Sequence, residues 1–230
     1  MKCDIKIING LVVDPSQKIN SIYDIIINDG LITDIIKNSN KYDPVHIIDA
    51  KDCVVTPGLI DLHVHVYPHC PLGINCHDVI ASGGVTTMLD AGSSGSTNFH
   101  IFKENYIDKS NDSMLCLINL SRIGLIADNL GELVDRRYAD KKGCIDIIKN
   151  NRDIVSGVKI RAGSHIIGTG KDALNNLNDA IEAARSTNTR VMVHIGECPI
   201  PVPDILSMLS HGDCITHCFK SGSTRIIDDV

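Results

Sequence analysis

The chain has 230 residues, 43% of them hydrophobic and 22% charged, which is typical of a globular protein with a sizeable core. Its net charge of −6, without a cluster of lysine or arginine, argues against nucleic acid or an anionic membrane as the main partner. No apolar run is long enough to cross a bilayer, and the nine cysteines are irregularly spaced, as in proteins with reduced thiols. We therefore expect a cytoplasmic protein that binds a small molecule, with no nucleic acid and no membrane as partner.

The first 57 residues contain short apolar stretches separated by turn signals, without a helical period. Asn9-Gly10 and Asp29-Gly30 are dipeptides that favour tight hairpins. The predicted strands cover residues 4–8, 11–13, 23–27, 31–36, 46–49 and 53–55. We predict a small β-sandwich-like domain over residues 1–57, a composite domain whose C-terminal part is missing, with a boundary near Pro57-Gly58.

From residue 58 to residue 230, apolar strand-like runs alternate with helix-length segments, which is typical of βαβ units on a parallel sheet. The predicted strands cover residues 59–66, 86–91, 114–121, 155–161, 190–195 and 214–219. The predicted helices cover residues 78–82, 98–108, 141–150, 174–186 and 203–209. This order fits either an open doubly wound sheet or a (β/α)8 barrel.

Polar residues at the ends of several strands favour the barrel. They are His63, His65, Asp90, Asn119, Ser121, Lys159, Arg161, His194 and His217. In a barrel, the carboxyl ends of the strands converge on one mouth, whereas an open sheet binds ligands at one switch point, often with a glycine-rich phosphate loop. The sequence has no such loop. We predict an α/β fold, an incomplete (β/α)8 TIM barrel with strands one to six.

The first of these strands carries two histidines two residues apart. Because successive side chains of a strand alternate in direction, His63 and His65 share one face, while Leu62 and Val64 lie on the other. Imidazoles that point into a barrel need partners, and a metal ion is a common one. A lysine such as Lys159, placed in a barrel interior, also needs a partner, unless it snorkels to solvent.

Several motifs resemble one known family. They are Pro57-Gly58-Leu59-Ile60-Asp61-Leu62-His63-Val64-His65, Gly83-Gly84-Val85-Thr86-Thr87, Gly157-Val158-Lys159, Val193-His194 and Thr216-His217. In order and strand placement they resemble the amidohydrolase superfamily. The segments 91–93, 119–125, 193–197 and 215–219 are more closely similar to its amidohydrolase/deacetylase branch, often labelled dihydroorotase-like.

The resemblance implies a binuclear metal site. His63 and His65 match the ligands of the first metal, and His194 and His217 match those of the second. Lys159 matches the lysine that takes up carbon dioxide and bridges both ions as a carbamate. We therefore expect two divalent ions, with zinc as the expected metal.

The implied reaction is attack of a metal-bridging hydroxide on a carbon–nitrogen bond other than a peptide bond, or on an acetyl group, of a small acid. The family's proton carrier is an aspartate at the end of the eighth strand, which we expect beyond Val230, so no catalytic residue of this kind is assigned within the chain. The alternative is a truncated, catalytically incompetent fragment. A deaminase is a third reading, disfavoured by Lys159 because deaminases of this superfamily generally use one metal and no carboxylated lysine.

Two further residues are predicted to bind substrate. Tyr67 and Arg161 lie two residues beyond His65 and Lys159, and we expect both to point into the mouth. The guanidinium of Arg161 suits a carboxylate. Dihydroorotases resemble this chain but carry an arginine where Tyr67 stands, so we expect an acylated hydroxy or amino acid rather than dihydroorotate. A homo-oligomer of the complete protein is compatible with this reading.

Overall fold

The computed structural model describes residues 1–220, except for the side chains of residues 78, 79, 81 and 82. The chain forms two compact units, Met1–Leu59 and Ile60–Val230.

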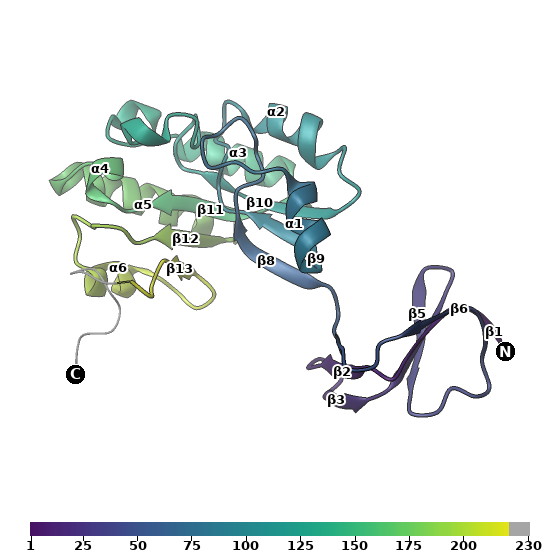
Figure 1. The fold of residues 1–230 in the computed structure, drawn as a ribbon. Coiled ribbons are helices and arrows are strands. Elements are labelled where there is room, and N and C mark those ends of the chain that lie inside the picture. Colours follow the sequence, from purple (N-terminus) through teal and green to yellow (C-terminus); the bar gives the residue numbers. More distant parts are fainter. Residues whose placement is uncertain (221–230) are drawn as a thin grey trace. The chain divides into compact units, whose positions relative to one another are not determined.

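The first unit contains two small β-sheets (Figure 1). Its strands are β1 (Lys2–Ile8), β2 (Leu11–Asp14), β3 (Ile19–Ile22), β4 (Asp24–Asn28), β5 (Leu31–Ile36), β6 (Asp43–Asp49) and β7 (Val54–Val55). One sheet has the order β5-β4-β1-β6 and the other the order β3-β2-β7. Cys3 in β1, Val12 in β2 and Ile26 in β4 are buried. The predicted small β domain is confirmed.

The two predicted hairpin turns have different outcomes. Asp29 and Gly30 join β4 to β5 in antiparallel pairing, and their φ angles of 52° and 74° are those of the turn that such a dipeptide favours. The hairpin predicted at Asn9-Gly10 is wrong, because β1 pairs with β4 and β6 while β2 pairs with β3 and β7. Gly10 serves close packing instead, since a Cβ there would lie 2.5 Å from Cγ2 of Val55.

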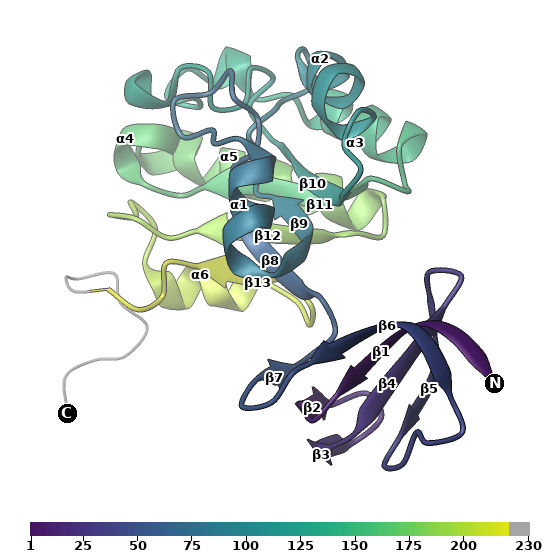
Figure 2. The same ribbon diagram turned by 45° about the vertical axis from the view of Figure 1, so that its right-hand side comes forward.

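The second unit is built on a six-stranded sheet, which curls as Figures 1 and 2 show. Its strands are β8 (Leu59–Val64), β9 (Val85–Asp90), β10 (Ser113–Asn119), β11 (Val155–Arg161), β12 (Arg190–His194) and β13 (Cys214–Thr216). The spatial order, β8-β9-β10-β11-β12-β13, follows the chain, and the pairs from β9 to β13 are parallel. A doubly wound sheet would reverse its order at a switch point. The unbroken order confirms the incomplete (β/α)8 barrel.

Helices connect the strands and cover the sheet. They are α1 (Cys76–Gly83), α2 (Phe99–Phe102), α3 (Lys141–Asn150), α4 (Ser164–Ile167), α5 (Gly170–Ser186) and α6 (Val202–Met208). The longest, α5, packs against β11 and β12, and α3 packs against β10 and β11. Leu177, Ala180 and Ala184 are buried on one face of α5, as their helical spacing requires.

Several short elements, α4 among them, were not predicted as they occur. The predicted helix over residues 98–108 is divided into α2 and the π-helical turn η1 (Lys103–Ile107). The 3-10 turns η2 (Asp128–Leu130) and η3 (Arg136–Tyr138) lie between β10 and α3. They are too short to carry a sequence period.

All nine cysteines are free thiols, as expected. In the part of the chain that the structure describes, no helix combines the length and the apolar character needed to span a bilayer.

Candidate metal centre

A cavity of about 520 Å³ opens at the carboxyl end of the six-stranded sheet. It is lined by His63, His65, Leu72, Lys159, Arg161, His194 and His217. The structure therefore brings together all five residues predicted to bind metal, and Arg161 with them. The metal-binding candidates and Arg161 stand at the ends of four strands or directly after them, and they meet because parallel strands end at the same edge of the sheet.

The strands set the positions of these side chains. In β11, Lys159 and Arg161 share a face because they are two residues apart, and Arg161 pairs in register with His194, the last residue of β12. His194 in turn pairs with Thr216, the last residue of β13. His217 follows directly, with a left-handed φ of 66°, so β13 ends before the predicted residue 219.

The imidazoles lie close to one another. The ring centroids of His63 and His65 are 5.6 Å apart, those of His63 and His217 are 5.1 Å apart, and those of His194 and His217 are 4.3 Å apart. Nζ of Lys159 lies 3.4 Å from Nε2 of His63. Within residues 1–220, no group of three or more His, Cys, Asp or Glu side chains is arranged to hold a metal ion as the side chains stand.

Burial keeps these groups in their uncharged forms. Burial is the main cause that lowers the pKa of His63 to about 4 and the pKa values of His65 and His194 to about 3, with further contributions from neighbouring cations. Neutral imidazoles have the free lone pair that a metal ion requires. The donor set therefore fits a divalent metal.

Lys159 is the least exposed residue of the cluster, with 1% of its surface accessible. Burial lowers the pKa of Lys159 to about 8, although Asp90 partly opposes that shift. The amine is therefore much more often neutral than in an exposed lysine, and only a neutral amine can take up carbon dioxide. Gly92, with φ of 81°, packs against the stem of this side chain, and Asn119 donates a hydrogen bond of 3.0 Å to the carbonyl oxygen of Gly92.

Arg161 is held by two carboxylates that the sequence reading did not identify. Its Nε and Nη2 donate to Oε1 and Oε2 of Glu132 at 2.8 and 2.6 Å, and Nη2 lies 2.5 Å from Oδ1 of Asp128. Although burial opposes it, the two carboxylates raise the pKa of Arg161. Both acids lie in the irregular segment between β10 and α3, where no helical or strand periodicity of the sequence could predict which side chains point inward. The usable signal was Arg161 itself, since a buried arginine requires a buried carboxylate.

The structure does not bring Tyr67 to this cavity. Because β8 ends at Val64, the alternation of a strand does not extend to residue 67. The Tyr67 ring is 2% exposed and lies 4.9 Å from the ring of Phe102 and 5.8 Å from that of Tyr106, measured between centroids. This position gives the predicted substrate contact of Tyr67 no support, and that role stays a prediction.

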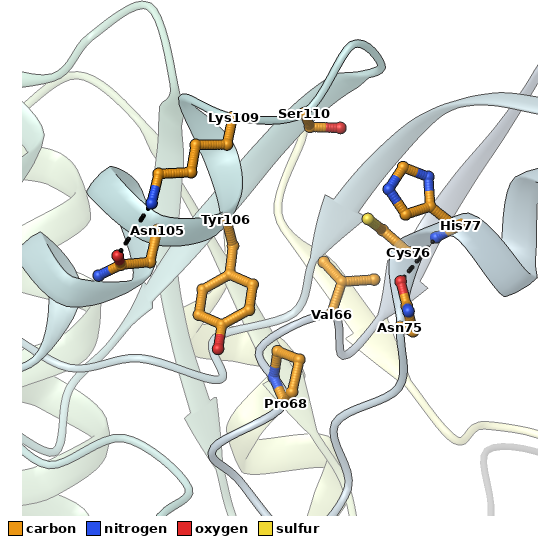
Figure 3. A pocket seen from close by; sticks show the side chains of 9 residues that line it. All are labelled: Val66, Pro68, Asn75, Cys76, His77, Asn105, Tyr106, Lys109 and Ser110. Atoms are coloured by element: carbon orange, nitrogen blue, oxygen red, sulfur yellow. Dashed lines mark hydrogen bonds between the residues drawn. The ribbon is translucent and has the colours of Figure 1, made fainter.

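A second, smaller cavity of about 240 Å³ lies beside the segment after β8 (Figure 3). Its lining consists of Val66, Pro68, Asn75, Cys76, His77, Asn105, Tyr106, Lys109 and Ser110. Lys109 donates to Asn105 at 3.3 Å, and the side chain of Asn75 accepts from the backbone of His77 at the start of α1. These contacts are local, and we assign no chemistry to this cavity.

The chain is similar to known proteins both in sequence and in fold. No protein-family model matches the chain. The chain is 37% identical to a deacetylase of Brucella anthropi over 205 residues, which cover 87% of this chain and 50% of the relative. The solved structure of a dihydroorotase matches with a TM-score of 0.85 and 32% identity, covering 96% of this chain and 58% of that one. An adenine deaminase matches with a TM-score of 0.82 and 28% identity, covering 98% of this chain and 59% of that one.

The barrel topology, the residues clustered at its mouth and these sequence and structural similarities all indicate the same superfamily. The chain belongs to the amidohydrolase superfamily. Among its curated relatives are proteins named deacetylase and dihydroorotase, and the chain spans about half the length of the first relatives it matches.

Proposed function

We propose that this chain carries the metal centre of a binuclear hydrolase. The enzyme would act on a carbon–nitrogen bond other than a peptide bond, or on an acetyl group, of a small acid. The observation that supports this proposal is the convergence of four histidines, each with its pKa lowered chiefly by burial, and one buried lysine on a single cavity. We place the protein in the cytoplasm, in keeping with its free thiols.

In this proposal, His63 and His65 would hold one divalent ion, His194 and His217 the other, and carboxylated Lys159 would bridge them. When bound, two such ions polarise a carbonyl oxygen and make hydroxide available near neutral pH. The chain's own contribution is to keep the imidazoles neutral and to hold the Lys159 amine where carbon dioxide can react with it. Zinc suits this nitrogen-rich donor set, and it is the metal we propose.

Arg161 is the group on which we base the substrate class. Its Nε and Nη2 are already bonded to Glu132 and Asp128, so a substrate carboxylate would approach through Nη1. The guanidinium would then orient an acylated hydroxy or amino acid by its carboxylate.

An adenine-type deaminase is the second candidate, because one structural neighbour is an adenine deaminase. Lys159 favours the amide or acetyl hydrolase, since a carboxylated lysine serves a site with two ions. A third possibility is a fragment that binds metal through the same histidines and Lys159 but does not turn over substrate.

One assay separates these readings. The purified chain, loaded with zinc in the presence of bicarbonate, is given an N-acetyl amino acid, the corresponding uncharged N-acetyl amino amide, and adenine. We expect two zinc ions per chain and, in a protein that also carries the aspartate expected beyond Val230, release of acetate, faster from the acid than from the amide. Release of ammonia from adenine would support the deaminase, and zinc binding without turnover would support the incompetent fragment. A chain that binds no zinc would contradict the proposal.

The packing of Gly92 against Lys159 provides a test of the geometry. A Cβ at Gly92 would lie 2.5 Å from Cβ of Lys159, so we expect Gly92→Ala to displace this lysine and to reduce the bound zinc from two ions to one. Gly84→Ala is the matched control, because Gly84 also has a left-handed φ, 67°, but open space around its missing Cβ. The control should lose only about 1–2 kcal/mol of stability to backbone strain and keep its zinc. Metal analysis and thermal unfolding measure the two effects, and equal zinc content in both variants would contradict the prediction.

A further inference from the structure

Ser93 lies between a buried carboxylate and one of the clustered histidines. Its Oγ is 2.9 Å from Nδ1 of His65 and donates to Oδ2 of Asp90 at 2.7 Å. Ser93 and Asp90 both have no accessible surface. The three side chains therefore form a line of hydrogen bonds that leads from the interior to the wall of the larger cavity.

The direction of each hydrogen bond follows from the chemistry of Asp90. Its two oxygens receive three donors: the backbone N–H of Ser93 at 2.7 Å, the backbone N–H of Val66 at 2.9 Å and the hydroxyl of Ser93. Burial raises the pKa of Asp90, but the three donors oppose that shift and favour the ionised carboxylate, which can only accept. The single hydroxyl proton of Ser93 is thus committed to Asp90, so Oγ accepts at its contact with Nδ1 of His65. His65 then carries its proton on Nδ1, and its Nε2 keeps a lone pair.

The backbone around His65 is fixed on both sides. Besides the bond from the Val66 N–H to Asp90, the N–H of Ala91 donates to the carbonyl oxygen of Val64 at 2.8 Å. The N–H of Ile74 donates to the carbonyl oxygen of His65 at 2.9 Å. One carboxylate therefore ties the segment after β8 to the segment after β9, and the remaining freedom of His65 is the rotation and tautomer of its ring.

We propose that Ser93 is a positioning residue that fixes this ring. It holds His65 in the Nδ1–H tautomer and presents Nε2 to the cavity as a metal ligand. The inference rests on the proposed metal site, and it assigns to Ser93 and Asp90 the orientation of one ligand. Asp90 acts on His65 through Ser93, and the Asp61 carboxylate accepts instead from the backbone N–H of His63.

The neighbouring Ser94 offers a matched control. It is equally inaccessible, but its Oγ has no hydrogen-bond partner within the described residues. Ser94→Ala therefore removes the same atoms from the same segment without touching His65. Ser93→Thr is the conservative variant, because it retains a hydroxyl at the position that Ser93→Ala empties.

The test combines two measurements on the chain. Long-range ¹H–¹⁵N correlation spectra of metal-free protein, labelled at histidine, report which nitrogen of His65 carries the proton. Competition with a chromophoric chelator, in the presence of bicarbonate, reports the affinity for zinc. We expect the Nδ1–H tautomer in the wild type and in Ser94→Ala, and loss of that preference in Ser93→Ala. We expect zinc affinity to fall by roughly 10–100-fold in Ser93→Ala, as is usual when an outer-shell partner is removed, and to return in Ser93→Thr.

The outcomes separate this inference from the proposed function. An Nε2–H tautomer in the wild type would overturn it without any variant, and so would a loss of affinity that is equal in Ser93→Ala and Ser94→Ala. A Ser93→Ala protein with unchanged tautomer and affinity would overturn it as well. If the wild type binds no zinc while its His65 tautomer still depends on Ser93, the positioning role stands and the proposed metal function fails.

Discussion

Replacing Lys159 with alanine is expected to remove at least one of the two bound metal ions. Lys159 is the residue proposed to bridge them, and its Nζ lies 3.4 Å from Nε2 of His63. Without the carbamate of Lys159, the two cations would lose one of the anions that offset their mutual repulsion. Metal analysis after dialysis against zinc and bicarbonate should give at most one ion per chain, and turnover should fall by more than the roughly 100-fold that loss of an outer-shell partner costs.

Two controls separate bridging from packing. Lys159→Met retains much of the buried volume but lacks the amine, so it should lose the same ion as Lys159→Ala. Lys171→Ala removes an exposed lysine from α5 and should keep both ions. Labelled bicarbonate should produce a carbamate carbon signal that disappears in Lys159→Ala. Two tightly bound ions in the alanine variant would show that Lys159 does not bridge.

The largest effect on stability is expected from Glu132→Ala. Glu132 is inaccessible and holds Arg161 through two hydrogen bonds of 2.8 and 2.6 Å. Removal of one partner leaves a buried charge without its main partner, which typically costs about 3–5 kcal/mol. Urea unfolding followed by circular dichroism should show a loss of this size in the free energy of unfolding.

The matched comparison is an exposed ion pair. Asp146 pairs with Lys142 on the surface of α3, and the side chains are 51% and 87% exposed. Asp146→Ala should therefore change the free energy of unfolding by no more than about 0.5 kcal/mol. The double variant Glu132→Leu, Arg161→Met should recover much of the lost stability, because it removes both charges. A loss in Glu132→Ala as small as that in Asp146→Ala would contradict the prediction.

The class of fold was readable from local patterns. Runs of apolar residues place the six strands of the second unit within a few residues of their observed bounds, because strands of a parallel sheet that is covered on its faces are rich in apolar residues. The strand β3 was missed, since its residues are largely exposed and show no apolar run. The hairpin predicted at Asn9-Gly10 failed because the dipeptide determines a turn, whereas the strands that flank it pair with strands from other parts of the chain.

The cluster at the cavity was readable because its residues stand at strand ends. The sequence by itself determined that His63, His65, Lys159, His194 and His217 lie at one edge of a parallel sheet, since chain direction alone sends those ends to the same side. The tertiary structure decided which side chains complete their surroundings. Glu132, in an irregular segment, binds Arg161. Ser93, which follows β9, contacts His65, which follows β8. Tyr67 turns into an aromatic cluster. Contacts of this kind depend on where loops close in space, and no local period of the sequence encodes that closure.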